Sequence, residues 1–220
     1  IIASFTNKIT KFLQQLITQT YQVILFLSIP AAAGLSVLSY PTFAVLFGFE
    51  DMEVGGYILR YYAPVAVLFS LFSVTGAVLQ GINRQRYAVV SLVAGLIIKV
   101  ISAYTLIYIG GPAGASFSTL LGFGVAVIFN MWAIGKFTDF EYKNVGKHFL
   151  FISLFTFIMS AAVLLVKEGA VTMFPLQSWG NAFLVELFSV VTGAGLYFIL
   201  SVKSGLAGKV LGDRFTILKK

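Results

Sequence analysis

The sequence contains no cysteine and a single histidine, His148, among its 220 residues. Without cysteine the chain has no disulfide framework and no thiolate metal site, and one imidazole cannot build a histidine metal site by itself. We therefore expect no bound metal and no cofactor. The redox compartment stays open, because cysteine usage is its usual sign.

Motifs for catalysis and nucleotide binding are also missing. The sequence has no glycine-rich loop followed by Lys and Ser or Thr, no His-Glu-x-x-His and no credible pair of nucleophile and base. We therefore predict that the protein is not an enzyme and has no catalytic residues. Regularly spaced arginines and a filter-like loop are absent as well, which argues against a voltage sensor and a potassium pore.

Charged residues make up only 10% of the chain, hydrophobic residues make up 59%, and the mean hydropathy is +0.95. Soluble domains usually contain about 25% charged residues. The composition therefore predicts an integral membrane protein. The net charge of +7 is explained by membrane topology and contact with anionic headgroups, so we expect no nucleic-acid binding.

Long apolar runs are what the sequence has in abundance, each close to the ~20 residues of a spanning helix. Six such runs cover 22–47, 57–79, 87–109, 113–134, 149–166 and 181–202. They predict an all-α, polytopic membrane helix bundle with six transmembrane helices. The predicted division is a lead-in helix at 1–21, four transmembrane helices within 22–134, a cytoplasmic loop at 135–148, two transmembrane helices within 149–202 and a basic cytoplasmic tail at 203–220.

The predicted lead-in helix is amphipathic, because apolar residues recur at helical spacing with polar residues between them. The apolar set is Phe5, Ile9, Phe12, Leu13, Leu16 and Ile17. Such a helix either lies in the membrane interface or lengthens the first span. The second interpretation is favoured, since no strong helix breaker occurs before Pro30.

The distribution of charges predicts the orientation in the membrane. If every run spans, the cationic segments all fall on one side, at Lys8, Lys11, Arg84, Arg86, Lys136, Lys143, Lys147, Lys203, Lys209, Arg214, Lys219 and Lys220. The opposite side carries Glu50, Asp51, Glu53 and Glu168 with a single Lys167. Because cationic loops stay in the cytoplasm, we expect a multi-pass protein of the bacterial plasma membrane with both ends of this chain inside.

Lys99 interrupts the otherwise uncharged stretch 87–108. A charge at membrane depth costs at least ~2.5 kcal/mol on insertion scales, so it normally faces a bundle interior or a wet cavity. Steps of about four residues place Ser91, Gly95 and Ala103 on the same stripe. Two interpretations stay open: Lys99 contacts substrate in a transport cavity, or it forms a structural ion pair that joins two helices.

Arg60 and Glu186 are the other ionisable residues inside predicted spans, and both are weaker candidates for substrate binding. Arg60 stands beside Tyr57, Tyr61 and Tyr62, so it fits a side chain that reaches the interface within an aromatic belt. Glu186 could pair with Lys99 or Arg60 if their helices are neighbours. It could also be protonated and silent, or carry a coupling proton.

Small residues recur at every fourth position of the fourth run, at Gly110, Gly114, Ser118, Gly122 and Ala126. Such a stripe lets helices approach closely in lipid, so we interpret it as a packing seam. Pro30 and Pro64 lie inside predicted spans, and each removes a backbone hydrogen bond. These two positions are candidate helix kinks.

Several short motifs, in this order and spacing, resemble one transporter family. They are Pro30-Ala-Ala-Ala-Gly34, Tyr40-Pro41, Leu46-Phe47-Gly48, Leu79-Gln-Gly-Ile-Asn-Arg84, Leu96-Ile-Ile-Lys99 and Gly111-Pro-Ala-Gly-Ala-Ser-Phe-Ser-Thr119. The chain resembles the polysaccharide-transporter branch of the multidrug/oligosaccharidyl-lipid/polysaccharide (MOP) exporter superfamily, with the greatest likeness to MurJ-type lipid II flippases of low-GC Gram-positive bacteria. Members have fourteen spanning helices in two lobes, so the six runs here correspond to the ninth to fourteenth. Together with a start at Ile1 rather than Met, this implies a C-terminal fragment.

The resemblance implies a flippase that moves an undecaprenyl-linked cell-wall precursor, lipid II, from the inner to the outer leaflet by alternating access. Lys99 would supply part of the positive charge that a diphosphate needs in a low-dielectric cavity. The missing N-terminal lobe would supply more, and the last two helices would form a groove for the lipid tail. The implied partners are the lipid-linked oligosaccharide, the bilayer, the N-terminal lobe and cell-wall synthesis enzymes.

Three alternatives remain at this point. Exporters of other polysaccharide or teichoic-acid lipid intermediates share the motifs of this half. A drug or cation antiporter of the same superfamily would use a membrane carboxylate, for which Glu186 is the candidate. A non-transporting scaffold for cell-wall synthesis would use Lys99 only as a structural pair.

Overall fold

The computed structural model describes residues 2–138, 140 and 143–211, with side chains for 12–138, 140, 145–146 and 148–210. All regular structure in these residues is α-helical. The helices are α1 (Ile2–Val37), α2 (Ser39–Phe47), α3 (Met52–Tyr62), α4 (Val65–Gly81), α5 (Gln85–Thr138), α6 (Lys143–Met173), α7 (Trp179–Lys203) and α8 (Leu206–Leu211). The predicted all-α helix bundle is therefore confirmed.

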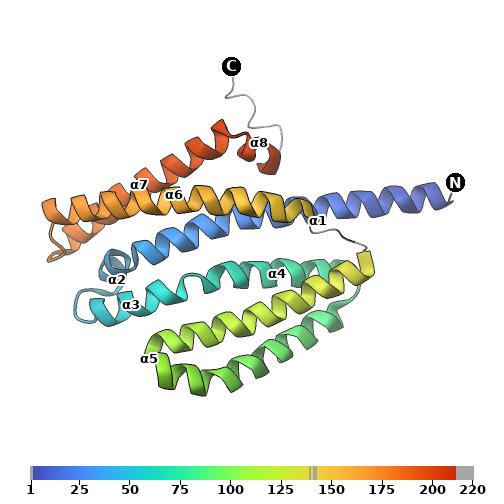
Figure 1. Cartoon of the computed structure of the whole chain (residues 1–220), viewed down its shortest axis with the longest axis horizontal. Coiled ribbons are helices and arrows are strands. Elements are labelled where there is room, and N and C mark those ends of the chain that lie inside the picture. The colour runs from blue at the N-terminus through green and yellow to red at the C-terminus, as the bar shows by residue number, and fades with distance from the viewer. Residues whose placement is uncertain (1, 139, 141–142, 212–220) are drawn as a thin grey trace.

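Helix α1 lies between two layers of the elongated molecule (Figure 1). On one side it packs against α6, which in turn packs against α7, and on the other it packs against α4, which packs against α5. The short helices α2 and α3 contact each other at one end of the bundle, where α2 also reaches α7. Residues from the start and the end of the chain therefore meet along α1.

Helix α5 is two arms joined by a sharp turn rather than one straight rod (Figure 1). Gly111 in the turn has φ 56° and ψ −137°, a backbone conformation that is strained for any residue with a Cβ atom. The first arm (85–110) and the second arm (112–138) run back along each other. They carry the third and fourth apolar runs that the sequence predicts.

Four helices in the described part of the chain are long and apolar enough to cross a membrane: α1, α5, α6 and α7. Helices α3 and α4 form a fifth candidate if they are one span, because only a short break at Ala63 and Pro64 separates them and the bend there is 42°. This count treats α5 as one helix despite its two arms. The predicted number of six spans stays a prediction.

The helix bounds differ from the predicted bounds in three places. Helix α1 continues from Ile2 through the predicted boundary at 21/22 and through Pro30, but it ends at Val37, so the apolar run 22–47 is divided between α1 and α2. The predicted loop 135–148 contains the end of α5 and the start of α6. The physical reason is that helical hydrogen bonds extend into polar segments, whereas hydropathy locates only the apolar part.

The predicted tail 203–220 begins with a short helix, α8, that packs against α1 and α7. Its apolar side chains Leu206, Ala207 and Val210 are buried. These residues join a hydrophobic core that includes Tyr21, Leu79, Ile134 and Ile152. The rest of the predicted tail, residues 212–220, lies outside the described residues.

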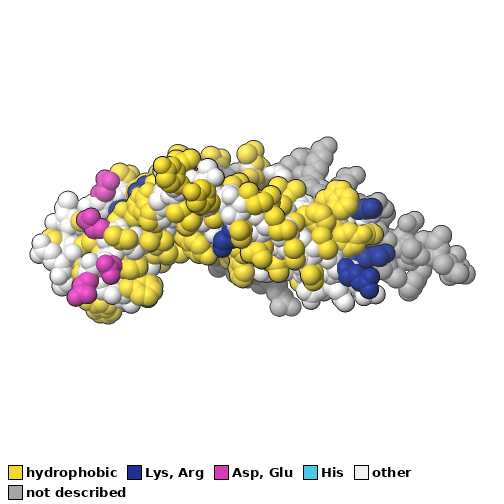
Figure 2. Space-filling model, turned by 90° about the horizontal axis from the view of Figure 1, so that it is seen from below, with side chains coloured by type: hydrophobic (Ala, Val, Ile, Leu, Met, Phe, Trp, Pro, Cys, Tyr) yellow, Lys and Arg dark blue, Asp and Glu magenta, His cyan; other side chains and the backbone are white. Residues whose placement is uncertain are grey.

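Charged side chains separate toward the two ends of the molecule. Figure 2 shows a face that is mostly hydrophobic, with Asp and Glu gathered at one end and most Lys and Arg at the other. The acidic end contains Glu50 and Asp51 between α2 and α3, and Glu53 in the first turn of α3. The cytoplasmic position of the basic end stays a prediction, because it rests on the distribution of lysine and arginine alone.

A buried hydrogen bond joins α4 to the second arm of α5 and gives a first test of this packing. The Asn130 amide Nδ2 donates to Thr75 Oγ1 at 2.9 Å, and both side chains are completely buried. Thr75→Val keeps the shape but removes the acceptor, so we expect a loss of about 1 kcal/mol of unfolding free energy. The matched control is Thr192→Val, whose exposed hydroxyl bonds only to its own helix at Phe188. Equal thermal midpoints for the two purified variants would contradict the expectation.

Candidate functional site

Lys99 lies on the first arm of α5, partly buried against the second arm. It lines a small hollow of about 130 Å³ together with Gly95, Thr119, Gly122 and Phe123. The hollow exists because the two arms touch at glycines: an added Cβ at Gly95 would lie 2.5 Å from the Gly122 carbonyl oxygen. Small residues therefore allow the Gly122 carbonyl, the Thr119 hydroxyl and the Lys99 ammonium to lie along the same contact between the two arms.

The Lys99 ammonium makes no hydrogen bond or ion pair with any residue that the structure describes. The predicted pairing of Glu186 with Lys99 or Arg60 is not formed between these described side chains. Glu186 Oε1 instead accepts a hydrogen bond from Thr42 Oγ1 at 2.9 Å. No described residue supplies the acceptor that an ammonium in an apolar helix needs.

Arg60 lies in the last turn of α3, and its side chain is exposed. Its carbonyl oxygen accepts a hydrogen bond from Ser36 Oγ at 2.8 Å, which ties α3 to the end of α1. The neighbouring rings of Tyr57 and Tyr61 contact each other edge to face, with their centroids 4.9 Å apart. Exposure beside tyrosines is what a cation in an interfacial aromatic belt would show.

Lys167 lies near Arg60, although it follows the end of the predicted apolar run 149–166. It belongs to α6, and its ammonium donates to the Val37 carbonyl oxygen at 3.3 Å, at the end of α1. The Arg60 guanidinium is close enough to interact electrostatically with it. A cation at a helix C-terminus is stabilised by the helix dipole, so Lys167 has a structural role here.

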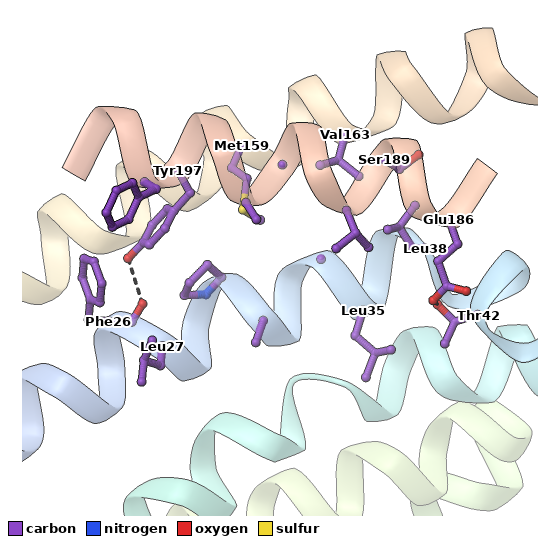
Figure 3. A pocket seen from close by; sticks show the side chains of 17 residues that line it. Phe26, Leu27, Leu35, Leu38, Thr42, Met159, Val163, Glu186, Ser189 and Tyr197 are labelled. Atoms are coloured by element: carbon purple, nitrogen blue, oxygen red, sulfur yellow. Dashed lines mark hydrogen bonds between the residues drawn. The ribbon is translucent and has the colours of Figure 1, made fainter. Parts of the chain in front are cut away.

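A cavity lies between α1 and α7 and is closed behind by α6 (Figure 3). Its volume is about 450 Å³, and nearly all of its lining is apolar. Typical lining residues are Pro30, Gly34 and Leu38 from one side and Met159, Val163 and Gly193 from the other. A cavity of this size and composition suits a hydrocarbon chain.

Hydrogen bonds mark both ends of this cavity, which we call the α1–α7 groove. At one end the Tyr197 hydroxyl donates to the Phe26 carbonyl oxygen at 2.9 Å, and the two rings pack with centroids 5.2 Å apart. At the other end the Glu186 carboxylate accepts from Thr42 (Figure 3). The groove therefore has an aromatic end and a carboxylate end.

The resemblance implies a groove on the last two helices, but the part that α1 takes in it and the residues Thr42, Ser189 and Tyr197 are not predicted from the sequence. A signal was present on α7, because Ser189, Gly193 and Tyr197 recur at every fourth position and all three are buried. Such spacing marks one packed face of a helix. The partner of that face could not be read from the sequence, since α1 lies more than 150 residues away.

The predicted small-residue stripe lies on the second arm of α5 and at the turn. Gly114, Ser118, Gly122 and Ala126 are buried. An added Cβ at Gly114 would lie only 1.9 Å from the Leu106 carbonyl oxygen, so the first arm passes directly over it. Gly110 is different, because nothing lies within 4 Å of an added Cβ there.

Metal-binding side chains do not gather in the part of the chain that the structure describes. No group of three or more His, Asp or Glu residues is close enough there to hold an ion.

Comparison with curated proteins gives three relatives. The chain is 38% identical over 217 residues to "Lipid II flippase MurJ" of Bacillus subtilis (strain 168), which covers 97% of this chain and 40% of that protein. It is 29% identical over 140 residues to "Probable low-salt glycan biosynthesis flippase Agl15" of Haloferax volcanii, covering 61% of this chain and 29% of that protein. It is 25% identical over 202 residues to "Uncharacterized membrane protein YabM" of Bacillus subtilis (strain 168), covering 91% of this chain and 37% of that protein.

The chain thus spans 40% or less of the length of these curated relatives. No protein-family model matches the chain, and no solved structure matches it. Together with the long apolar helices, the relatives identify a multi-pass membrane protein.

Proposed function

From the similarity of this chain to MurJ-type flippases of the MOP exporter superfamily, we propose that it is part of a flippase for lipid-linked glycan precursors. Two relatives are named as flippases, and the name of one of them refers to glycan biosynthesis. A flippase makes and breaks no chemical bond, so the site needs to bind and release its substrate and to exclude lipid. Its polar groups serve recognition rather than catalysis.

The observation that carries the proposal is the unpaired ammonium of Lys99. A lipid-linked glycan carries phosphate between its sugar and its polyprenyl chain, and that phosphate needs a positive charge where the dielectric constant is low. Lys99 has neither an ion pair nor a hydrogen bond among the described residues. It is therefore available to a phosphate, whereas the Thr119 hydroxyl beside it already donates to the Ala115 carbonyl oxygen at 3.0 Å.

The α1–α7 groove supports the same proposal from the other end of the substrate. It is apolar, it runs along two long helices, and α7 is one of the two helices that the resemblance assigns to the lipid tail. A polyprenyl chain in this groove would bury apolar surface at about 25 cal/mol per Å². Recognition would then divide into a cationic contact on α5 and an apolar contact on α7.

Lipid II is the substrate we favour, because the relative that matches 97% of the chain is named for it. We further propose that an N-terminal lobe completes the cavity, as the chain spans 40% of that relative. Arg60 would be a secondary contact at the outer surface. The basic ends of the helices would face the cytoplasm.

Complementation in bacterial cells depleted of their own lipid II flippase tests the proposal. Expression of the full protein that contains this chain should restore growth and expose lipid II on the outer leaflet, scored by its accessibility to an added enzyme or dye. The matched strain is depleted of a teichoic-acid precursor exporter instead. Rescue of that strain alone would mean that the substrate is the teichoic-acid precursor and not lipid II. Rescue of neither strain, with the protein at normal abundance in the membrane, would overturn the flippase proposal.

A further inference from the structure

The α1–α7 groove contains a carboxylate that the proposed substrate does not explain. Glu186 is the only charged residue among the described residues that line the groove. Its Oε1 atom accepts the Thr42 hydrogen bond, and no described lysine or arginine forms an ion pair with it. An anionic lipid would be repelled from this end, because burial makes an uncompensated like charge costly.

Ser189, one helical turn from Glu186, is among the lining residues of the groove but has no exposed surface. Its hydroxyl has no hydrogen-bond partner among the described residues, and it points away from the Glu186 carboxylate (Figure 3). The Glu186 carboxylate is therefore the acceptor that a polar ligand head would meet at this end of the groove.

The groove opens sideways along its length rather than at one end. Leu27 on α1 and Val190 and Phe198 on α7 line it, yet they are 58%, 47% and 42% exposed. In a membrane-spanning bundle this opening faces apolar surroundings, so a ligand would enter from the lipid phase. From Glu186 to Tyr197 the helix rises roughly 16 Å, which is about the reach of a dodecyl chain.

We propose that the α1–α7 groove is a binding site for single-chain amphiphilic amines. The ammonium donates a hydrogen bond to the Glu186 carboxylate, and the alkyl chain runs along the groove toward Tyr197. Charge complementarity selects the ligand, because a carboxylate at the end of an apolar channel favours a cationic head over a neutral or anionic one. Thr42 holds the carboxylate in place from α2.

This site does not depend on the proposed flippase activity. It shares the groove with the proposed polyprenyl chain, so an amine that fills the groove would compete with that chain. The amine site rests on Glu186 and the apolar groove, whereas the flippase proposal rests on Lys99. Failure of amine binding would leave the complementation result above unchanged.

Equilibrium binding of radiolabelled dodecylamine to the full protein in nanodiscs tests the proposal, with protein-free nanodiscs subtracted. Unlabelled dodecylamine should compete about tenfold more strongly than dodecanol, and dodecyl sulfate should compete least. Glu186→Gln should weaken amine binding about tenfold and leave dodecanol competition unchanged. The matched control is Glu168→Gln, a carboxylate exposed on α6 that does not line the groove.

A second variant keeps the test informative if the charge change alters folding. Ala194→Phe places a ring in the side opening of the groove and should reduce the binding of both the amine and the alcohol. The proposal is overturned if Glu186→Gln binds the amine as well as the parent protein does. It is equally overturned if dodecyl sulfate competes as well as dodecylamine, or if Ala194→Phe changes neither affinity.

Discussion

Replacing Gly122 with leucine should lower the unfolding free energy by about 3 kcal/mol or more, because it forces the arms of α5 apart. An added Cβ at Gly122 would lie 2.8 Å from the Gly95 carbonyl oxygen and 2.9 Å from the Lys99 Cβ. Both atoms belong to the first arm at or next to its backbone, so neither can rotate away. A more favourable helix propensity returns only about 1 kcal/mol.

Gly110→Leu is the matched control, because it changes the same residue type on the same predicted stripe. Nothing lies within 4 Å of an added Cβ at Gly110, and the position is exposed. Its thermal midpoint in detergent should stay close to that of the parent protein, whereas Gly122→Leu should melt much earlier or fail to accumulate in the membrane. Similar midpoints for the two variants would mean that the arms are not in contact in the folded protein.

These two glycines also show how far the sequence could predict this structure. The four-residue spacing of small residues predicts a packing stripe, and four of its five positions are buried. It does not predict where the stripe ends, so Gly110 was included although it lies at the exposed turn. The partner arm was predictable in part, because Gly110, Gly111 and Pro112 form a turn signal that brings adjacent apolar runs back along each other.

Contacts between distant helices were not predictable, because one sequence carries no information on which faces meet. The hydrogen bond from Thr42 to Glu186 joins residues 144 positions apart. Hydropathy correctly marks both helices as apolar. A given residue type, however, has the same hydropathy value whether it faces lipid or another helix. The α1–α7 groove therefore appears only when α1 and α7 are placed side by side.

Helix ends were missed for a related reason. Hydropathy measures burial in lipid, so it predicts one continuous run over 22–47, where the chain breaks at Leu38 between α1 and α2. The Pro64 position was a candidate kink, and the chain does bend by 42° between α3 and α4 at that point. Pro30, by contrast, lies inside a helix that continues to Val37, and the Phe26 carbonyl oxygen that it leaves without a backbone donor accepts a hydrogen bond from the Tyr197 hydroxyl of α7.

Charge reversal at Lys99 should have the largest effect on transport. If the ammonium contacts a substrate phosphate, Lys99→Ala loses a charge-assisted hydrogen bond of about 1.5–3 kcal/mol, which lowers the flipping rate roughly 10- to 100-fold. Lys99→Glu should be inactive, because it adds repulsion to that loss. Lys99→Arg should keep part of the activity, since guanidinium also binds phosphate. Outer-leaflet lipid II in depleted cells is the measurement, with membrane abundance determined in parallel.

Lys203→Ala is the matched control, because it removes an exposed lysine at the end of α7, far from the hollow between the α5 arms. A substrate contact and a structural ion pair predict different patterns. A structural pair with a carboxylate elsewhere in the full protein would be restored by Lys99→Arg, and its loss in Lys99→Ala would lower stability and abundance together. A substrate contact requires that Lys99→Ala be abundant and inactive. Full activity of an abundant Lys99→Ala would remove Lys99 from the transport mechanism.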